Sequence, residues 1–285
     1  MNVPQRILAL SYEIVLLAFA GAVQPAELKA VEVEPLRHAH AHNDYWHKRP
    51  LVDALEQGFT SVEADVYLVD GTLLVGHDRK ELHADRNLES LYLAPLAERV
   101  RRYQGRVMPG CDQFILLIDF KSESQLSCEA LSALLERYRE MLAVVEHDRV
   151  IDGPVHVIVT GNRPAVDADK QERTYFGLDG RIGDLDARVS AARMPMISDN
   201  WQNHFAWRGD GAMPAAERQK LKGLADKAHA AGRVLRFWAT PEKETVWAEL
   251  RGAGVDLVGS DDLQRLAKFF REKDPSAAEA ENNRK

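Results

Sequence analysis

The stretch FILLIDFK, residues 114–121, decides the fold of this chain. Its first five residues are apolar, and the first acidic residue, Asp119, comes only near its end. A strand that is covered on both faces in a parallel sheet has this composition. The stretch therefore predicts a buried strand at residues 114–120 of an α/β protein, with Asp119 and Lys121 where the strand leaves the apolar interior.

Outward from this strand, short apolar runs alternate with helical patterns, which is typical of βα units and a parallel sheet. The other strands are predicted at residues 36–42, 60–68, 155–160, 174–177, 194–198, 234–238 and 257–260. Helices are predicted at residues 51–57, 91–103, 125–146, 215–231, 242–252 and 263–271. This order predicts a single-domain TIM (β/α)8 barrel over residues 35–271. An open doubly wound sheet is the alternative, but no Gly-rich turn follows the first strand.

Length and composition agree with one barrel that has short ends. The chain has 285 residues, of which 45% are hydrophobic, and a formal net charge of −7. The sequence holds no basic stripe with interleaved aromatic residues, so no nucleic acid partner is expected. Residues 272–285 are polar and are predicted to form a disordered tail.

The N-terminus resembles a secretory signal peptide. A mostly apolar run at residues 7–23 follows one positive charge and ends in small residues, although Glu13 interrupts it. This pattern predicts a signal peptide at residues 1–23 and a secreted or periplasmic protein, with an amphipathic helix as the alternative. No other stretch reaches the ~18 residues of a membrane span, so the mature chain is expected to lack one.

Carboxylates gather at the predicted strand ends. Glu63 and Asp65 lie two residues apart and therefore share one face of strand 60–68, and Asp119 ends the next barrel strand. Buried carboxylates that face one another are costly unless a charge neutralises them. A divalent cation with oxygen ligands is one solution, and a salt bridge to a buried Lys or Arg, with Lys121 as a candidate, is the other.

Histidines end the neighbouring segments. Alternation places His38, His40 and His42 on one face of the first strand, with His42 nearest the mouth. His77 follows the extended piece 72–76 and reaches the same end. Two imidazoles beside a cation suit phosphoryl chemistry, because one takes a proton from the nucleophile and the other gives one to the leaving oxygen.

These segments together resemble the glycerophosphodiester phosphodiesterase family. Its relatives include the sphingomyelinase D-type phospholipases of venoms and the phosphatidylinositol-specific phospholipases C. The shared pattern is a first-strand His, an amphipathic helix, Glu-x-Asp, an Asp-Gly turn and His-Asp. In this chain it reads His42, helix 50–58, Glu63-Ala64-Asp65, Asp70-Gly71 and His77-Asp78. The match is specific over about residues 38–121.

The resemblance implies a phosphoric diester hydrolase that acts on a glycerophosphodiester or a phospholipid headgroup. It implies one Mg²⁺ or Ca²⁺ ion, since carboxylate ligands suit hard cations. The catalytic pair is then His42 and His77, the metal ligands are Glu63, Asp65 and Asp119, and the substrate contacts are Lys121 and Trp238. The usual Arg-Gly after the first His is replaced here by Asn43-Asp44-Tyr45, so Asn43 or Lys121 is expected to take over the phosphate contact of that Arg, and Asn43 is added to the substrate contacts.

Two other functions compete with this interpretation. A zinc amidohydrolase opens with His-x-His, which His40 and His42 match, and Asp261 offers a final acid, but the predicted strand 194–198 ends without histidine. A non-catalytic sugar- or lipid-binding barrel would use the aromatic loop WQNHFAW at residues 201–207.

Overall fold

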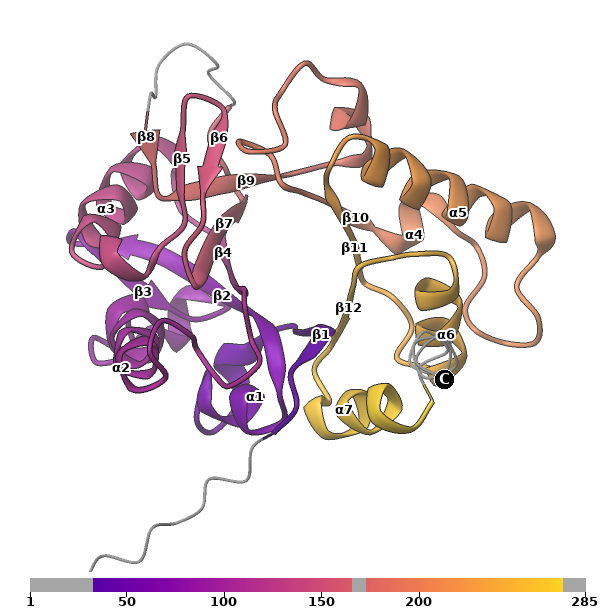
Figure 1. Cartoon of the computed structure of the whole chain (residues 1–285), viewed down its shortest axis with the longest axis horizontal. Coiled ribbons are helices and arrows are strands. Elements are labelled where there is room, and N and C mark those ends of the chain that lie inside the picture. Colours follow the sequence, from indigo (N-terminus) through magenta and orange to yellow (C-terminus); the bar gives the residue numbers. More distant parts are fainter. Residues whose placement is uncertain (1–32, 166–172, 274–285) are drawn as a thin grey trace, which may run out of the picture. The chain divides into compact units, whose positions relative to one another are not determined.

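Eight parallel strands close into a barrel in the computed structural model, which describes residues 33–165 and 173–273 (Figure 1). The strands pair in the order β1, β2, β4, β7, β9, β10, β11 and β12, and β12 returns to β1. Their bounds are β1 (Leu36–Ala41), β2 (Phe59–Val69), β4 (Phe114–Phe120), β7 (Val155–Gly161), β9 (Phe176–Gly180), β10 (Met196–Asn200), β11 (Val234–Trp238) and β12 (Leu257–Ser260). The predicted TIM barrel is confirmed.

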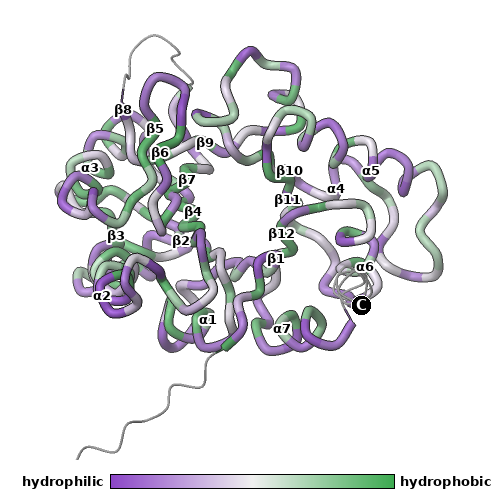
Figure 2. The backbone as a smooth tube through the Cα atoms, in the orientation of Figure 1, coloured by the Kyte–Doolittle hydropathy of each residue, from purple (hydrophilic) through white to green (hydrophobic). Residues whose placement is uncertain are grey.

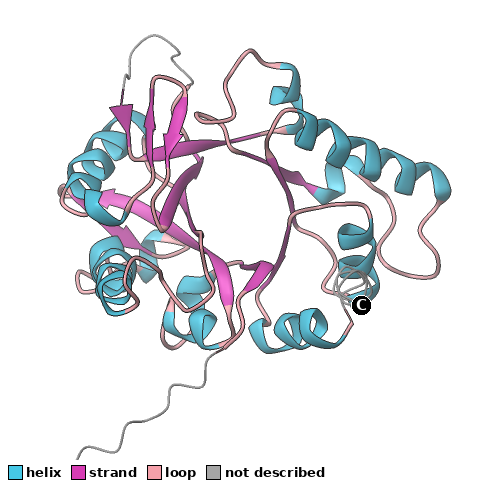
Figure 3. Ribbon diagram, viewed as in Figure 1, coloured by secondary structure: helices cyan, strands magenta, loops and turns pink. Residues whose placement is uncertain are grey.

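Helices surround the ring of strands (Figure 3). They are α1 (Val52–Glu56), α2 (Ala94–Arg102), α3 (Ser124–Glu136), α4 (Trp201–His204), α5 (Ala215–Ala230), α6 (Glu244–Gly252) and α7 (Leu263–Glu272). A π-helical turn, Glu89–Leu93, precedes α2, and single 3-10 turns lie at Asp44–Trp46, Arg79–Glu81, Arg139–Met141 and Ile182–Asp186. No helix in residues 33–165 or 173–273 is long and apolar enough to cross a membrane.

A hairpin brings a histidine back to the barrel mouth. Strand β3 (Thr72–Val75) runs antiparallel to β2 after a turn at Asp70 and Gly71, both with positive φ. Such two-residue turns match the twist of paired strands. The backbone N–H of Gly76 then bonds Asp65 O at 3.1 Å, so His77 lies beside the end of β2.

The predicted helix 125–146 is wrong in its second half. Helix α3 ends at Glu136, and β5 (Val144–Glu146) forms a hairpin with β6 (Arg149–Ile151) and also pairs with β8 (Arg173–Thr174). His147 and Asp148 have φ values of 48° and 58°, which make a tight hairpin turn. The β-branched pair Val144 and Val145 fits this strand better than a helix.

Two other predicted strands start too early. The fifth barrel strand is β9, not residues 174–177, and the sixth is β10, not residues 194–198. Strand β9 lacks a clear apolar pattern because neighbours pack directly on its backbone: a Cβ on Gly177 would lie 2.6 Å from Pro195 Cδ. The shift matters because β9 leads directly into Arg181.

The barrel interior changes from apolar to polar along the strands. A small internal cluster holds Leu117, Ile158, Met196 and Leu257. Two residues further along, on the same strand faces, stand Asp119, Thr160 and Ser198. The larger core joins the outer strand faces to the helices, and Figure 2 shows hydrophobic stretches along the strand ring. The polar end is therefore the carboxyl end, where barrel enzymes carry their sites.

The first strand does not keep one face. Its register with β2 shifts between Leu36 and His40. His38 lies against Phe270 of α7, whereas His40 is fully buried among the interior side chains. The expectation that His38 shares a face with His40 and His42 is therefore wrong. The predicted signal peptide, and the predicted tail beyond residue 273, lie outside the described residues.

Candidate active site

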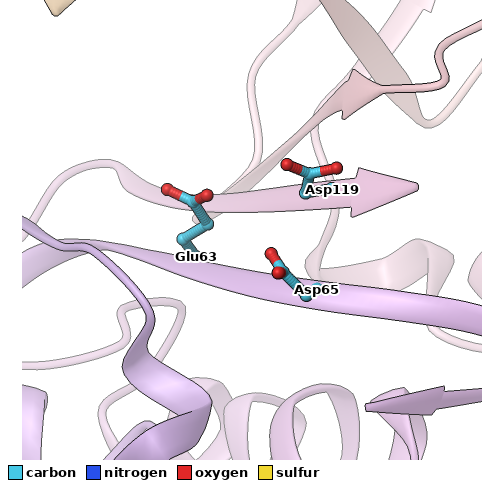
Figure 4. A group of neighbouring side chains, drawn as sticks. All are labelled: Glu63, Asp65 and Asp119. Carbon is cyan, nitrogen blue, oxygen red and sulfur yellow. The ribbon is translucent and has the colours of Figure 1, made fainter. Parts of the chain in front are cut away.

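Three carboxylates converge at the mouth of the barrel. Glu63 and Asp65 project from β2, and Asp119 projects from β4, where it is the direct register partner of Asp65 (Figure 4). One oxygen from each lies within 4.8 Å of the others. Glu63 and Asp65 are buried. The predicted cluster therefore forms, as alternation along adjacent parallel strands requires.

Basic side chains neutralise part of this charge. Arg236 Nη2 donates to Glu63 Oε2 at 2.6 Å, and His40 Nε2 lies 3.0 Å from the same oxygen. Lys121 Nζ lies 3.1 Å from Asp65 Oδ2 and 2.9 Å from Asp119 Oδ2. The salt bridge expected as an alternative to a cation therefore exists. The three carboxylates therefore face two permanently charged cations, Arg236 and Lys121.

The remaining imbalance appears in the titration of Asp119. Burial raises the pKa of Asp119 to about 6, and the charges of Asp65 and Glu63 reinforce this rise against the opposing effect of Lys121. The pKa of Glu63 is lowered instead, because Arg236 and His40 outweigh the cost of its burial. The protein itself therefore compensates the charge of Asp119 less than that of Glu63.

The donor set fits a hard divalent cation. Asp65 Oδ1 and Asp119 Oδ1 are buried and accept no hydrogen bond from any residue that the structure describes. Orphaned buried carboxylate oxygens are rare unless something else satisfies them. Glu63, Asp65 and Asp119 offer oxygen ligands alone, which favours Mg²⁺ or Ca²⁺ over Zn²⁺.

His77 is oriented by the second strand. Its Nδ1 lies 3.0 Å from Asp65 Oδ2 and 3.2 Å from the hydroxyl of Tyr45. The His77 side chain is 48% exposed and lines the cleft, and no described residue forms a hydrogen bond with its Nε2. Tyr45 is buried and its hydroxyl also lies 2.7 Å from both Asp65 Oδ2 and Asn43 Oδ1. One phenol therefore links the His77 side of the site to Asn43.

His42 has a carboxylate partner of its own. Its Nδ1 lies 2.6 Å from Asp261 Oδ1, which follows β12. Burial alone would lower the pKa of His42, but the hydrogen bond to Asp261 and the charge of Glu63 raise it above the ordinary value. Asn43 Nδ2 donates to Asp261 at 3.2 Å, so Asn43 holds this pair in addition to lining the cleft.

All predicted site residues line one cleft of about 500 Å³. Lys121 reaches it beside the carboxylates, and Trp238, which is 38% exposed, borders it at the end of β11. The next strands around the ring, β7, β9 and β10, and their following loops add Thr160, Asn162, Arg181 and Ser198, and Thr160 is the direct register partner of Asp119. The structure therefore brings together His42, His77, the three acids and the three predicted substrate contacts.

Four contributors were not assigned these places from the sequence. Tyr45 stood in the quoted His-Asn-Asp-Tyr stretch without a role, and Asp261 was weighed only for the amidohydrolase interpretation. Arg236 lies on a strand between apolar neighbours, which signals a buried partner. Arg181 was hidden because the fifth strand was placed too early.

The structure lacks the features that the zinc amidohydrolase and the non-catalytic binding barrel would need among the residues discussed for them. His40 lies beneath Glu63 and not at the mouth, and β9 and β10 end in Gly180 and Asn200. The aromatic side chains of loop 201–207 are packed inside: Trp201, Phe205 and Trp207 are buried, with Trp201 stacked on Phe205. They form no exposed binding platform.

Comparisons with known proteins agree with this geometry. The model of the AIM6-like phosphodiesterase domain matches residues 29–177, and that of the glycerophosphoryl diester phosphodiesterase family matches residues 234–264. The Altered inheritance of mitochondria protein 6 of Eremothecium gossypii is 29% identical over 84% of this chain and 70% of its own length. Its homolog from Arthroderma benhamiae is 27% identical over 81% and 83%.

A solved structure shares the fold. The glycerophosphodiester phosphodiesterase from Agrobacterium tumefaciens superposes with a TM-score of 0.50 and 14% sequence identity. The match covers 83% of this chain and 99% of that one. At this identity the likeness concerns the barrel alone.

Proposed function

Since this chain belongs to the AIM6-like phosphodiesterase domain family, we propose that it hydrolyses a phosphodiester in the cleft at the carboxyl ends of its strands. The substrate class is a glycerophosphodiester or a phospholipid headgroup, and the cofactor is one Mg²⁺ or Ca²⁺ ion. The observation that carries the proposal is the convergence of Glu63, Asp65 and Asp119 between two cleft-lining histidines.

The two histidines act as the acid–base pair. Each has a carboxylate at Nδ1, Asp261 for His42 and Asp65 for His77. A carboxylate at Nδ1 fixes the ring and leaves Nε2 as the nitrogen that exchanges protons with the substrate. One imidazole takes the proton of the attacking hydroxyl or water, and the other protonates the leaving alcohol oxygen.

The phosphoryl group would be held by the divalent ion and by Lys121. Glu63, Asp65 and Asp119 would hold the divalent ion, which would neutralise charge that develops on the phosphoryl oxygens. The Lys121 ammonium contacts two of these acids and borders the cleft. It therefore presents a positive charge to a phosphoryl oxygen at the same place.

Substitution of the ligands tests the proposal. Glu63→Gln and Asp119→Asn should each lower hydrolysis of bis-(p-nitrophenyl) phosphate at least ~100-fold, because each removes a charge that holds the cation. Asp226→Asn, on the exposed side of α5, is the matched control and should keep full activity. Added Mg²⁺ or Ca²⁺ should raise the Tm of the wild type and not that of Asp119→Asn. Full activity of the wild type in excess chelator would refute the scheme.

A further inference from the structure

The cleft has two chemically different walls. The first wall, from β1 to β4 and the segments that directly follow β1 and β3, carries His42, His77 and all three carboxylates. The second wall comes from β7, β9 and β10 and their following loops, and we define it by Thr160, Asn162, Arg181 and Ser198. Among the described residues that line the cleft, no carboxylate belongs to the second wall. Its charge at the cleft surface is the guanidinium of Arg181.

A buried carboxylate fixes this guanidinium. Asp179 is fully buried, and its Oδ2 accepts hydrogen bonds from Thr160 Oγ1 at 2.7 Å, from Ser198 Oγ and from Arg181 Nη1 at 3.0 Å. Asp179 itself does not reach the cleft surface. The hydroxyls of Thr160 and Ser198 therefore donate their protons to Asp179, which also holds Arg181 in one orientation.

The outer part of the Arg181 guanidinium can still donate hydrogen bonds to a ligand. Nη1 is occupied by Asp179, by Gly180 O at 3.1 Å and by Ser198 O at 3.4 Å. Among the residues that the structure describes, Nη2 contacts only Thr160 Oγ1, at 3.4 Å, and the Arg181 side chain is 36% exposed. A planar guanidinium with free N–H groups matches a carboxylate or a phosphate in a two-pronged hydrogen bond.

We propose that the second wall is a subsite for an anionic group, a carboxylate or a second phosphate, carried by the alcohol part of the substrate. This inference rests on the proposed function, which places the reacting phosphoryl group at the first wall. The cleft of about 500 Å³ leaves room for both parts. The subsite narrows the substrate class to phosphodiesters whose headgroup carries an additional negative charge.

Two pairs of non-hydrolysed probes test the subsite by calorimetry in the presence of Mg²⁺ or Ca²⁺. O-Phosphoserine and O-phosphoethanolamine differ by one carboxylate, and the bisphosphate and monophosphate of propane-1,3-diol differ by one phosphate. The wild type should bind the anionic member of at least one pair ~10-fold more tightly, as a charge-assisted pair implies. The pair that discriminates identifies the group. Less than 2-fold discrimination in both pairs overturns the proposal.

Variants assign the discrimination to Arg181. Arg181→Gln should bring the ratio of the two dissociation constants close to one, and Arg181→Lys, which keeps the charge without the planar fork, should give an intermediate ratio. Arg163→Gln removes a charge that pairs with Asp184 and does not line the cleft, so it should keep the wild-type ratio. A wild-type ratio of dissociation constants in both Arg181 variants would overturn the proposed subsite, because its charge at the cleft surface is the Arg181 guanidinium.

The proposed function and the subsite fail in different ways. Turnover of bis-(p-nitrophenyl) phosphate is measured on the same preparations, and this probe carries no second anionic group. Discrimination without turnover of this probe or of a phosphodiester whose headgroup carries a second anionic group refutes the hydrolase and keeps the subsite. Turnover without discrimination refutes the subsite and keeps the hydrolase.

Discussion

At the scale of single residues, Tyr45 connects Asn43, beside the first histidine, to Asp65 and His77. Its hydroxyl lies 2.7 Å from Asp65 Oδ2 and from Asn43 Oδ1, and 3.2 Å from His77 Nδ1. Burial and the charge of Asp65 raise the pKa of Tyr45 far above the ordinary value, so the phenol keeps its proton. A phenol donates one hydrogen bond at a time, and the charged oxygen of Asp65 is the stronger acceptor.

Tyr45→Phe is therefore expected to lower kcat about 10- to 100-fold. The free energy of unfolding should fall by only about 1 kcal/mol, the usual value of one hydrogen bond. The control is Tyr67→Phe, because among the described residues the Tyr67 hydroxyl donates only to the backbone oxygen of His77, and the effect of this variant on kcat should be a few-fold at most. Steady-state kinetics with thermal unfolding checks both. Equal effects of the two variants would contradict a special place for Tyr45.

At the scale of elements, the end of β7 shapes the part of the acidic cluster that lies on the neighbouring β4. Gly161 has a φ of 69°, and a Cβ there would overlap Asp119 Oδ1 and lie 2.6 Å from Phe120 O. The absence of a side chain at this position lets the Asp119 carboxylate take its place at the mouth. A strand end thus positions a residue of the next strand by leaving space.

Gly161→Ala should lower metal-dependent turnover at least ~100-fold, because Asp119 must move out of the cluster. The strained backbone and the overlap together should also cost about 1–3 kcal/mol of stability. Gly183→Ala is the matched control, since a Cβ there meets no atom within 4 Å. Turnover and Tm of both variants are the measurements. A Gly161→Ala enzyme with wild-type turnover would show that the glycine is not needed for the cluster.

At the scale of the whole molecule, one buried acid ties three segments together. Asp44 is fully buried in the turn after β1, and its Oδ2 accepts hydrogen bonds from the backbone N–H of Leu51 at 2.6 Å and from Tyr92 at 2.9 Å. Leu51 precedes α1, and Tyr92 lies before α2. Burial raises the pKa of Asp44 to about 7, although both hydrogen bonds oppose this rise.

This shift makes stability depend on pH. The native state binds the Asp44 proton more tightly than the unfolded state, so the contribution is full below pH ~4 and is lost as the pH rises through about 7. The free energy of unfolding of the wild type, minus that of Asp44→Asn, should fall by about 2–3 kcal/mol between pH 5 and pH 8. Urea unfolding at several pH values measures it.

The control for this prediction lies in the same segment. Asp53→Asn removes an acid that accepts a hydrogen bond from Arg49 and whose own pKa is lowered; its charge adds only the smallest contribution to the raised pKa of Asp44, so this variant should keep most of the fall in stability toward pH 8. Parallel pH dependence of the wild type and Asp44→Asn would contradict the assignment to Asp44.

Local patterns in the sequence were sufficient for the barrel and for the first wall of the cleft. The apolar run before Asp119 and the Glu-x-Asp spacing at Glu63 and Asp65 each depend on strand periodicity, which is a property of neighbouring residues. They predicted the strands, the shared face and the meeting of the three acids. The predictions failed for elements with a weak pattern, such as β9, whose glycines leave space for residues that pack directly on its backbone.

What the sequence determined by itself was the closed parallel sheet and the kinds of side chain that end its first strands, because alternation and chain order act over a few residues. Only the tertiary structure decided which charges meet across the barrel. Arg236 reaches Glu63 from 173 residues away, and Asp261 reaches His42 from 219. Such pairs follow from closure of the barrel, which pairs β12 with β1 and places β11 next to β12.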